Sequence, residues 1–389
     1  MYDVVLFGAS GFTGGLTAEY LAAHAPEGFR WALAGRSPAK LAAVRDRLAA
    51  IDPGVGGIDL LSADVDDDRS LRAVAESARV VATTVGPYVR YGDGLVAACA
   101  RAGTDYVDLC GEPEFVDRTY LRHHAAAEAS GARLVHSCGF DSVPHDLGAH
   151  FTVQRLPEGV PISVEGFVSA SATFSGGTFH SAVTAFSRLG ASARAARARR
   201  RVEGRPAGRV VRGRVGVPRY DRRVRAWVLP APTIDPQVVL RSAAALDRYG
   251  PEFRYSHEIA VRRLPSAVGL AGGVGALVAL AQVAPARKWL LERRKPGEGP
   301  SEAERAGSWF RVRFLGEGGG RRVVTEVSGG DPGYGETAKM LGESALCLAF
   351  DHLPDVRGQV TTAVAMGDAL TARLVAAGIR FAEVGRTGR

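Results

Sequence analysis

The stretch from Val4 to Gly14 constrains the fold more than any other part of the chain. Four consecutive apolar residues, Val4 to Phe7, precede three glycines at three-residue spacing, Gly8, Gly11 and Gly14. An apolar run of this kind is typical of a buried parallel strand. The residues that follow have a helical pattern that ends at Pro26. Together they predict the first half of a dinucleotide-binding βαβ unit.

Each glycine has an expected task in such a unit. We expect Gly8 to permit the tight turn, Gly11 to let the backbone approach a pyrophosphate at the helix N-terminus, and Gly14 to let helix pack on strand. The spacing is G-x-x-G-x-x-G rather than G-x-G-x-x-G, so its place directly after a strand carries much of the argument. A purely structural glycine turn is the alternative.

The end of the second predicted strand, residues 31–36, bears on which nucleotide fits. NAD-binding proteins usually carry Asp or Glu there for the ribose 2′-hydroxyl. This chain has Gly35-Arg36-Ser37, with Lys40 close behind. Arginine and lysine attract a 2′-phosphate and serine can hydrogen-bond it, which predicts NADPH as the cofactor. Arg36 as an ordinary surface residue is the alternative.

Further strands are expected at residues 58–64, 79–86, 105–111 and 133–139, with helices between them such as 95–102 and 114–130. This alternation predicts an α/β domain with a Rossmann-type, doubly wound parallel sheet over residues 1–150. Asp64 would lie near the adenine, or begin a helix instead. Thr84 and the Gly86-Pro87-Tyr88 segment would lie on the nicotinamide side.

The size and composition of the chain agree with a two-domain protein. It has 389 residues, 46% of them hydrophobic and 23% charged, as is typical of folded soluble proteins. Its four cysteines show no metal-like spacing, so we expect no metal site, and Cys99, Cys110 and Cys138 to be small core residues. The few residues before the first strand leave no room for a signal peptide, which favours a cytoplasmic protein.

Five motifs together resemble one family. They are Gly8 to Gly14, Ala34 to Ser37, Gly86 to Tyr88, Tyr106 to Glu112 and Gly139 to Pro144. As a set they resemble the saccharopine dehydrogenase-like oxidoreductases, and within them most closely the trans-acting enoyl reductases of lipid and polyketide pathways. Residues 334–340 and 358–378 are similar as well. The resemblance implies NADPH-dependent reduction but does not fix the substrate. An acyl thioester, carried on an acyl carrier protein or a polyketide synthase, is the substrate that we favour.

The candidate site residues follow from these motifs. The expected cofactor-binding residues are Gly8, Ala9, Ser10, Gly11, Phe12, Thr13, Gly14, Arg36, Ser37, Lys40, Asp64, Thr84, Gly86, Pro87, Tyr88, Cys138 and Gly139. The candidate catalytic residues are Tyr88, as proton or oxyanion donor, and Asp141 and Ser142 after the sixth strand, beside His145. Ser142 as a helix cap is the alternative. Asp108 and Glu112 could act in the site or satisfy backbone groups around Gly111.

The second half, residues 151–355, predicts an α+β domain with an antiparallel sheet. We expect a strand at 162–172, a helix at 179–201, a loop at 288–305, and a hairpin of strands 309–315 and 322–327. The family resemblance suggests that Thr178, after Ser175-Gly176-Gly177, faces the substrate, although a plain N-cap is the alternative. Helices at 336–350 and 359–377 and a strand at 379–384 should return to the first domain, with 356–389 as the C-terminal part.

Residues 188–225 are rich in arginine, within a chain of net charge +8. A solvated face is the default interpretation. Docking of an acidic carrier protein or of a pantetheine phosphate is the second. Nucleic-acid binding has no recognition motif to support it, so we expect no nucleic-acid partner.

Residues 264–286 contain no charged side chain and are bracketed by Arg263 and Arg287. The length is near that of a membrane span. A buried core or substrate-lining helix, a membrane-surface or lipid contact, and a true span all remain open. Because basic residues lie at both ends, the positive-inside rule would not predict the orientation of such a span in the membrane.

These features favour a cytoplasmic, NADPH-dependent reductase of an acyl-thioester double bond, with peripheral contact to a membrane left open. A saccharopine-type amino-acid dehydrogenase is one alternative, although few positions suit a zwitterion. A non-catalytic NADP-binding protein at a lipid surface is the other.

Overall fold

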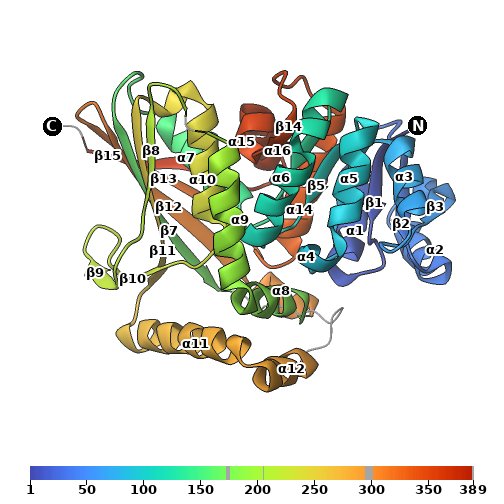
Figure 1. Cartoon of the computed structure of the whole chain (residues 1–389), viewed down its shortest axis with the longest axis horizontal. Coiled ribbons are helices and arrows are strands. Elements are labelled where there is room, and N and C mark those ends of the chain that lie inside the picture. Colours follow the sequence, from blue (N-terminus) through green and yellow to red (C-terminus); the bar gives the residue numbers. More distant parts are fainter. Residues whose placement is uncertain (172–175, 205, 294–300, 388–389) are drawn as a thin grey trace.

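The computed structural model describes residues 1–171, 176–204, 206–293 and 301–387. Two sheets lie side by side and are joined by helices that pack between them (Figure 1). The first sheet has seven strands, in the order β14-β6-β5-β4-β1-β2-β3. Its strands are β1 (Tyr2–Phe7), β2 (Trp31–Gly35), β3 (Asp59–Ser62), β4 (Ala78–Thr83), β5 (Asp105–Asp108), β6 (Arg133–Val135) and β14 (Gly358–Val360).

All pairings in the first sheet are parallel, and helices cover both faces. Val4 and Leu6 of β1 face one core, whereas Val5 and Phe7 face the other, as the alternation of a strand requires. The first core is covered by α1 (Phe12–His24), α2 (Pro38–Leu48) and α14 (Gly335–Phe350). The second is covered by α3 (Asp68–Ser77), α5 (Asp93–Ala102) and α6 (Pro113–Ser130).

The second sheet has eight strands and is mostly antiparallel, but β11 pairs in parallel with β7 and β8. Its strands are β7 (Ile162–Ser171), β8 (Val210–Arg214), β9 (Arg219–Asp221), β10 (Ala226–Pro230), β11 (Glu252–Val261), β12 (Trp309–Gly318), β13 (Arg321–Gly329) and β15 (Arg380–Thr387). The helices α7 (Val143–Val153) and α10 (Asp235–Ala245) pack on it. The predicted fold class is thus confirmed.

The remaining helices lie around these layers. The α9 helix (Leu189–Val202) packs on α6, while α8 (Gly176–Ser187), α11 (Leu264–Gln282) and α12 (Ala284–Glu292) form a unit at the lower edge of Figure 1. Short helical segments complete the chain: α4 (Tyr88–Tyr91), α13 (Glu302–Ala306), α15 (Thr362–Ala365), α16 (Gly367–Ala376) and the 3₁₀ turns η1 (Pro53–Gly57) and η2 (Asp247–Tyr249).

Several details in the second half differ from the sequence predictions. The helix expected at 179–201 is two helices that break at Arg188, and the loop expected at 288–305 contains the end of α12 and α13, with 294–300 outside the described residues. The helix expected at 359–377 begins as β14, because three residues pair with β6 at the edge of the first sheet. The last strand, β15, pairs with β13 and so belongs to the second sheet.

Candidate functional site

The glycine turn after β1 forms a cradle that side chains would fill. Gly8 has a φ of +92°, and its N–H donates to the Ala34 carbonyl at 2.8 Å. A Cβ on Gly14 would lie 2.2 Å from the Gly8 carbonyl oxygen and 2.8 Å from Thr84 Oγ1. No side chain caps α1, whose N-cap is Gly11, and Ser10 and Gly11 are exposed. An open helix N-terminus beside bare backbone is what a pyrophosphate needs.

The predicted 2′-phosphate residues lie at the carboxyl end of β2. Arg36 and Lys40 are exposed, and neither makes an ion pair with any described residue. Ser37 is the N-cap of α2, where its hydroxyl accepts from the Lys40 N–H at 3.5 Å. Asp64 accepts from the Asp66 N–H and lies before the first residue of α3 rather than in it. Arg36, Ser37 and Lys40 are the residue types that suit an adenosine 2′-phosphate, whereas the Asp64 carboxylate is expected beside the adenine.

The end of β4 joins the glycine turn to the expected nicotinamide side. The Thr84 hydroxyl donates to the Gly8 carbonyl at 3.2 Å. Next to it, the buried Glu112 carboxylate accepts from the N–H groups of Tyr88 and Val89 and from the Ser181 hydroxyl of α8. Burial raises the pKa of Glu112, against the effect of these hydrogen bonds. Glu112 therefore holds the Gly86 to Tyr88 segment in place.

Tyr88 has a different environment from the one expected of a proton donor. Its ring is 4% exposed. Its hydroxyl donates to the Thr83 carbonyl at 3.2 Å and accepts from the Leu109 N–H at 3.1 Å. Burial, and then the charge of Asp108, raise the pKa of Tyr88 well above its ordinary value. The hydroxyl joins the ends of β4 and β5, which suits a positioning residue.

Asp108 is likewise engaged by the protein. Its carboxylate accepts from the Tyr106 hydroxyl and from the N–H groups of Cys110 and Ser137, and it contacts His136 Nδ1 at 2.6 Å. The residue is completely buried. This supports the structural interpretation of Asp108 over a role in the reaction.

The segment after β6 brings the remaining candidates to the same edge of the sheet. Cys138 is completely buried, and a Cβ on Gly139 would meet Leu109 at 2.8 Å, so both pack beneath the edge. Asp141 is exposed, and its carboxyl group lies 3.4 Å from where a Cβ on Gly111 would be. The protein around the Asp141 carboxyl group displaces water from it, which raises its pKa, and the negative charge of Asp235 raises it further. Together they bring the pKa of Asp141 to about 7, although the charge of His145 acts to lower it.

Ser142 is the N-cap of α7, but its hydroxyl makes no capping hydrogen bond. It instead donates to Asp235 Oδ1 at 3.5 Å. Thr178 lies in the first turn of α8, and its side chain is outside the described residues.

Three buried side chains of kinds that can bind a metal ion, His145, Asp235 and His257, lie next to Ser142. The sequence predictions include His145 but neither Asp235 nor His257. His145 Nδ1 is 3.1 Å from Asp235 Oδ1, and His257 Nε2 is 3.4 Å from Asp235 Oδ2. Their potential ligand atoms fall within 4.8 Å of one another, close enough to share a metal ion or a proton. Burial lowers the pKa of His257 to about 4. No spacing rule could join positions so far apart in sequence.

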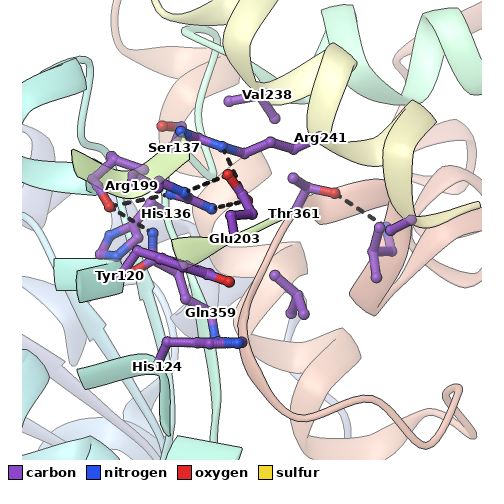
Figure 2. A pocket seen from close by; sticks show the side chains of 14 residues that line it. Tyr120, His124, His136, Ser137, Arg199, Glu203, Val238, Arg241, Gln359 and Thr361 are labelled. Carbon is purple, nitrogen blue, oxygen red and sulfur yellow. Dashed lines mark hydrogen bonds and ion pairs between the residues drawn. The ribbon is translucent and has the colours of Figure 1, made fainter. Parts of the chain in front are cut away.

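A small cavity of about 150 Å³ lies between α6, α9, α10 and the segment after β14. Figure 2 shows Arg199 and Arg241 meeting Glu203 across it. Both guanidinium groups also pair with Asp117, and Arg199 stacks over the Tyr120 ring at 3.8 Å. Two cations balanced by two carboxylates tie α6 to the second half of the chain, so the cavity is a structural junction.

This junction changes the interpretation of the arginine-rich stretch. Arg199 is 3% exposed, and Arg188, Arg219 and Arg223 each pair with a carboxylate. The side chains of Arg194, Arg197, Arg200 and Arg201 on α9 are exposed. Some arginines of the stretch therefore stabilise the fold through ion pairs, whereas those exposed on α9 form a basic surface that faces solvent.

Known proteins match both the sequence and the fold. The family model of the saccharopine dehydrogenase NADP binding domain matches residues 4–135. A Mycobacterium tuberculosis protein, named provisionally as a trans-acting enoyl reductase, is 40% identical over 97% of this chain and 96% of its own. The trans-acting enoyl reductase of Mycobacterium ulcerans is 36% identical with the same coverage.

A solved structure agrees with this match. The saccharopine dehydrogenase of Saccharomyces cerevisiae shares the fold, with a TM-score of 0.57 at 13% identity over 98% of this chain and 99% of its own. The chain is an NADP-dependent oxidoreductase. It belongs to the saccharopine dehydrogenase-like family, in the branch of the trans-acting enoyl reductases.

Proposed function

We propose that this chain reduces the carbon–carbon double bond of a lipidic or polyketide acyl thioester that is carried by a partner protein. The observation that supports this most is the 36–40% identity, across nearly the whole chain, to proteins named as trans-acting enoyl reductases. A reductase that acts in trans must take its acyl chain from another protein, either an acyl carrier protein or a polyketide synthase.

The structure offers a fitting place for NADPH. The Gly8 to Gly14 cradle would hold the pyrophosphate, and Arg36, Ser37 and Lys40 would hold the 2′-phosphate. Thr84, Gly86 and Pro87 would line the nicotinamide side. Bound NADPH supplies the hydride that is added to the β-carbon of the enoyl thioester.

The α-carbon then needs a proton, and Asp141 is the residue that we assign to donate it. Its carboxyl oxygen holds a proton up to about neutral pH, since its pKa is raised to about 7. Its exposure lets it recover that proton from water after each turnover. The buried Tyr88 hydroxyl, bonded to backbone on both sides, has neither property. Ser142 would act as a positioning residue through Asp235.

The test is NADPH oxidation with an enoyl thioester, measured from pH 5.5 to 9. With Asp141 as the acid, kcat/KM should be flat below about pH 7 and fall tenfold per pH unit above it, because the deprotonated carboxylate cannot donate. Asp141→Asn should lower kcat by about 10²–10⁴-fold and abolish the fall in kcat/KM above pH 7, while NADPH binding is retained. The exposed Asp66→Asn is the control.

The alternatives predict other results in the same assay. A saccharopine-type dehydrogenase would oxidise NADPH with a keto acid and an amine rather than with the thioester. A non-catalytic protein would bind NADPH and turn over neither substrate. Either result would contradict the proposal.

Two surfaces give the proposed substrate a route to the site. The exposed arginines of α9 would dock an acidic carrier. We take the enzyme to be cytoplasmic. Lipid contact through residues 264–286 would place it at a membrane surface, because α11 is apolar and only 11% of its apolar stretch is buried.

A further inference from the structure

The fold leaves one apolar helix almost uncovered. Over the described residues, α11 is the helix whose length and composition would allow it to cross a bilayer, yet only 11% of it is buried. Leu264, Val268, Leu270 and Leu280 are exposed. A core helix would be mostly buried, so the core interpretation of residues 264–286 is wrong. The position, in the middle of the chain, also differs from that of a signal sequence.

Both ends of α11 are fastened to the same side of the protein. Its N-terminus follows β11 of the second sheet directly. Near its C-terminus, Ala281 packs with Val183 of α8 and Leu290 of α12 in a small separate core, and Gln282 Nε2 donates to the Phe186 carbonyl at 2.6 Å. A span would carry one end to the far side of the bilayer. The helix is therefore placed to lie along a surface.

The charges around α11 indicate which surface. Residues 262–293 contain five basic residues, Arg262, Arg263, Arg287, Lys288 and Arg293, and one acidic residue, Glu292. Trp289 of α12 is 49% exposed, with the Arg293 guanidinium 4.2 Å from its ring centroid. Exposed apolar side chains with tryptophan and basic flanks are typical of helices in the membrane interface.

We propose that α11 and α12 dock this enzyme in the plane of a bilayer that contains anionic lipid. A second copy of the chain is the weaker occupant, because its equally basic flanks would repel the first. An acidic carrier would leave the exposed leucines and valines without a partner. An anionic bilayer satisfies both the charges and the apolar surface.

The docking surface is linked to the proposed active site through α8. Ser181 of α8 donates to Glu112, which holds the Gly86 to Tyr88 segment. The Ser181 hydroxyl is 3.8 Å from where a Cβ on Gly86 would be. Docking would therefore bring the edge of the site toward lipid, where a long acyl chain dissolves. This consequence rests on the proposed function, whereas the docking itself does not.

Vesicle flotation tests the docking. The full chain should float with vesicles of phosphatidylcholine and phosphatidylglycerol at 7:3 and far less with phosphatidylcholine alone. Arg263→Gln with Lys288→Gln should weaken binding roughly 30-fold, since each basic residue near an anionic surface contributes about fivefold. Leu270→Asp with Leu280→Asp should weaken it by at least about tenfold.

A matched control separates position from charge. Val375 of α16 and Val384 of β15 are 50% and 44% exposed, and both elements lie on the side of the molecule away from α11 (Figure 1). Val375→Asp with Val384→Asp therefore adds the same charge elsewhere and should leave flotation unchanged. In the unmodified chain, Trp289 emission should shift to shorter wavelength on vesicle binding, and Trp289→Phe should remove the shift. This second measurement needs no aspartate variant to fold.

Three results would overturn the docking proposal: no flotation with anionic vesicles, equal loss in the control and the Leu270/Leu280 variant, or a dimer in solution that this variant makes monomeric. NADPH oxidation with a soluble short-chain enoyl thioester should be the same in all these variants. Its absence in the unmodified chain would count against the proposed function and leave the flotation result valid.

Discussion

Replacing Arg36 by alanine should weaken NADPH binding and leave NADH binding unchanged. Arg36 is exposed at the carboxyl end of β2, has no ion-pair partner among the described residues, and is followed by Ser37 and Lys40. A hydrogen bond to a charged group contributes about 1.5–3 kcal/mol. Because solvent screens this exposed position, we expect about 1.5–2 kcal/mol, which is a loss of roughly 10- to 30-fold in affinity.

Fluorescence titration measures both affinities, and thermal or urea unfolding checks them independently. NADPH at 100 times the unmodified Kd should stabilise the parent protein by about 2.7 kcal/mol. A variant with 30-fold weaker binding should gain only about 0.9 kcal/mol at the same concentration. NADH should stabilise both proteins equally. The exposed Arg101→Ala, at the end of α5, is the control.

Equal loss of NADPH and NADH affinity in Arg36→Ala would remove Arg36 from the 2′-phosphate site. An unchanged NADPH affinity would do the same. Loss in Lys40→Ala alone would transfer the role to that residue.

Two further changes test other parts of the structure. Gly14→Ala should lower the NADPH affinity, and it should lower the urea midpoint by an amount that corresponds to about 1–3 kcal/mol of stability. The reason is that the added methyl group would lie 2.2 Å from a backbone oxygen. Gly15→Ala is the control and should be tolerated, because its methyl group would meet only the end of a flexible arginine side chain, at 3.1 Å. Arg200→Gln with Arg201→Gln should slow turnover of carrier-bound substrate and reduce its salt dependence, while small thioesters react as before; an unchanged carrier rate would favour a solvated face.

The first half of the fold could be predicted because its signals are local. A buried strand, a glycine turn and a helix follow one another between Tyr2 and His24, and the same alternation repeats through β6. The cradle at Gly8 and Gly14 also depends on neighbours in sequence, with Ala34, Thr84 and Val85 as its more distant partners. Local spacing therefore carried both the fold and the expected cofactor site.

The rest depends on contacts between distant segments. The three residues of β14 form a strand only because β6 offers them an edge. Arg199 looks like part of a basic surface in sequence, but Asp117 and Glu203 enclose it. Similarly, Tyr88 follows a strand where a donor is expected, yet its hydroxyl joins two strand ends. Burial of a polar side chain is decided by partners that spacing does not reveal.

One helix connects these parts. The α8 helix packs its apolar residues against α11 and α12 in a small core of its own, and it donates a hydrogen bond from Ser181 to the buried Glu112. Glu112 in turn holds the N–H groups of Tyr88 and Val89 at the nicotinamide side. A shift of α8 would thus leave a buried carboxylate with fewer donors, which is costly. The position of the apolar unit and the shape of the proposed site are therefore coupled through Glu112, so that docking and catalysis need not be independent events.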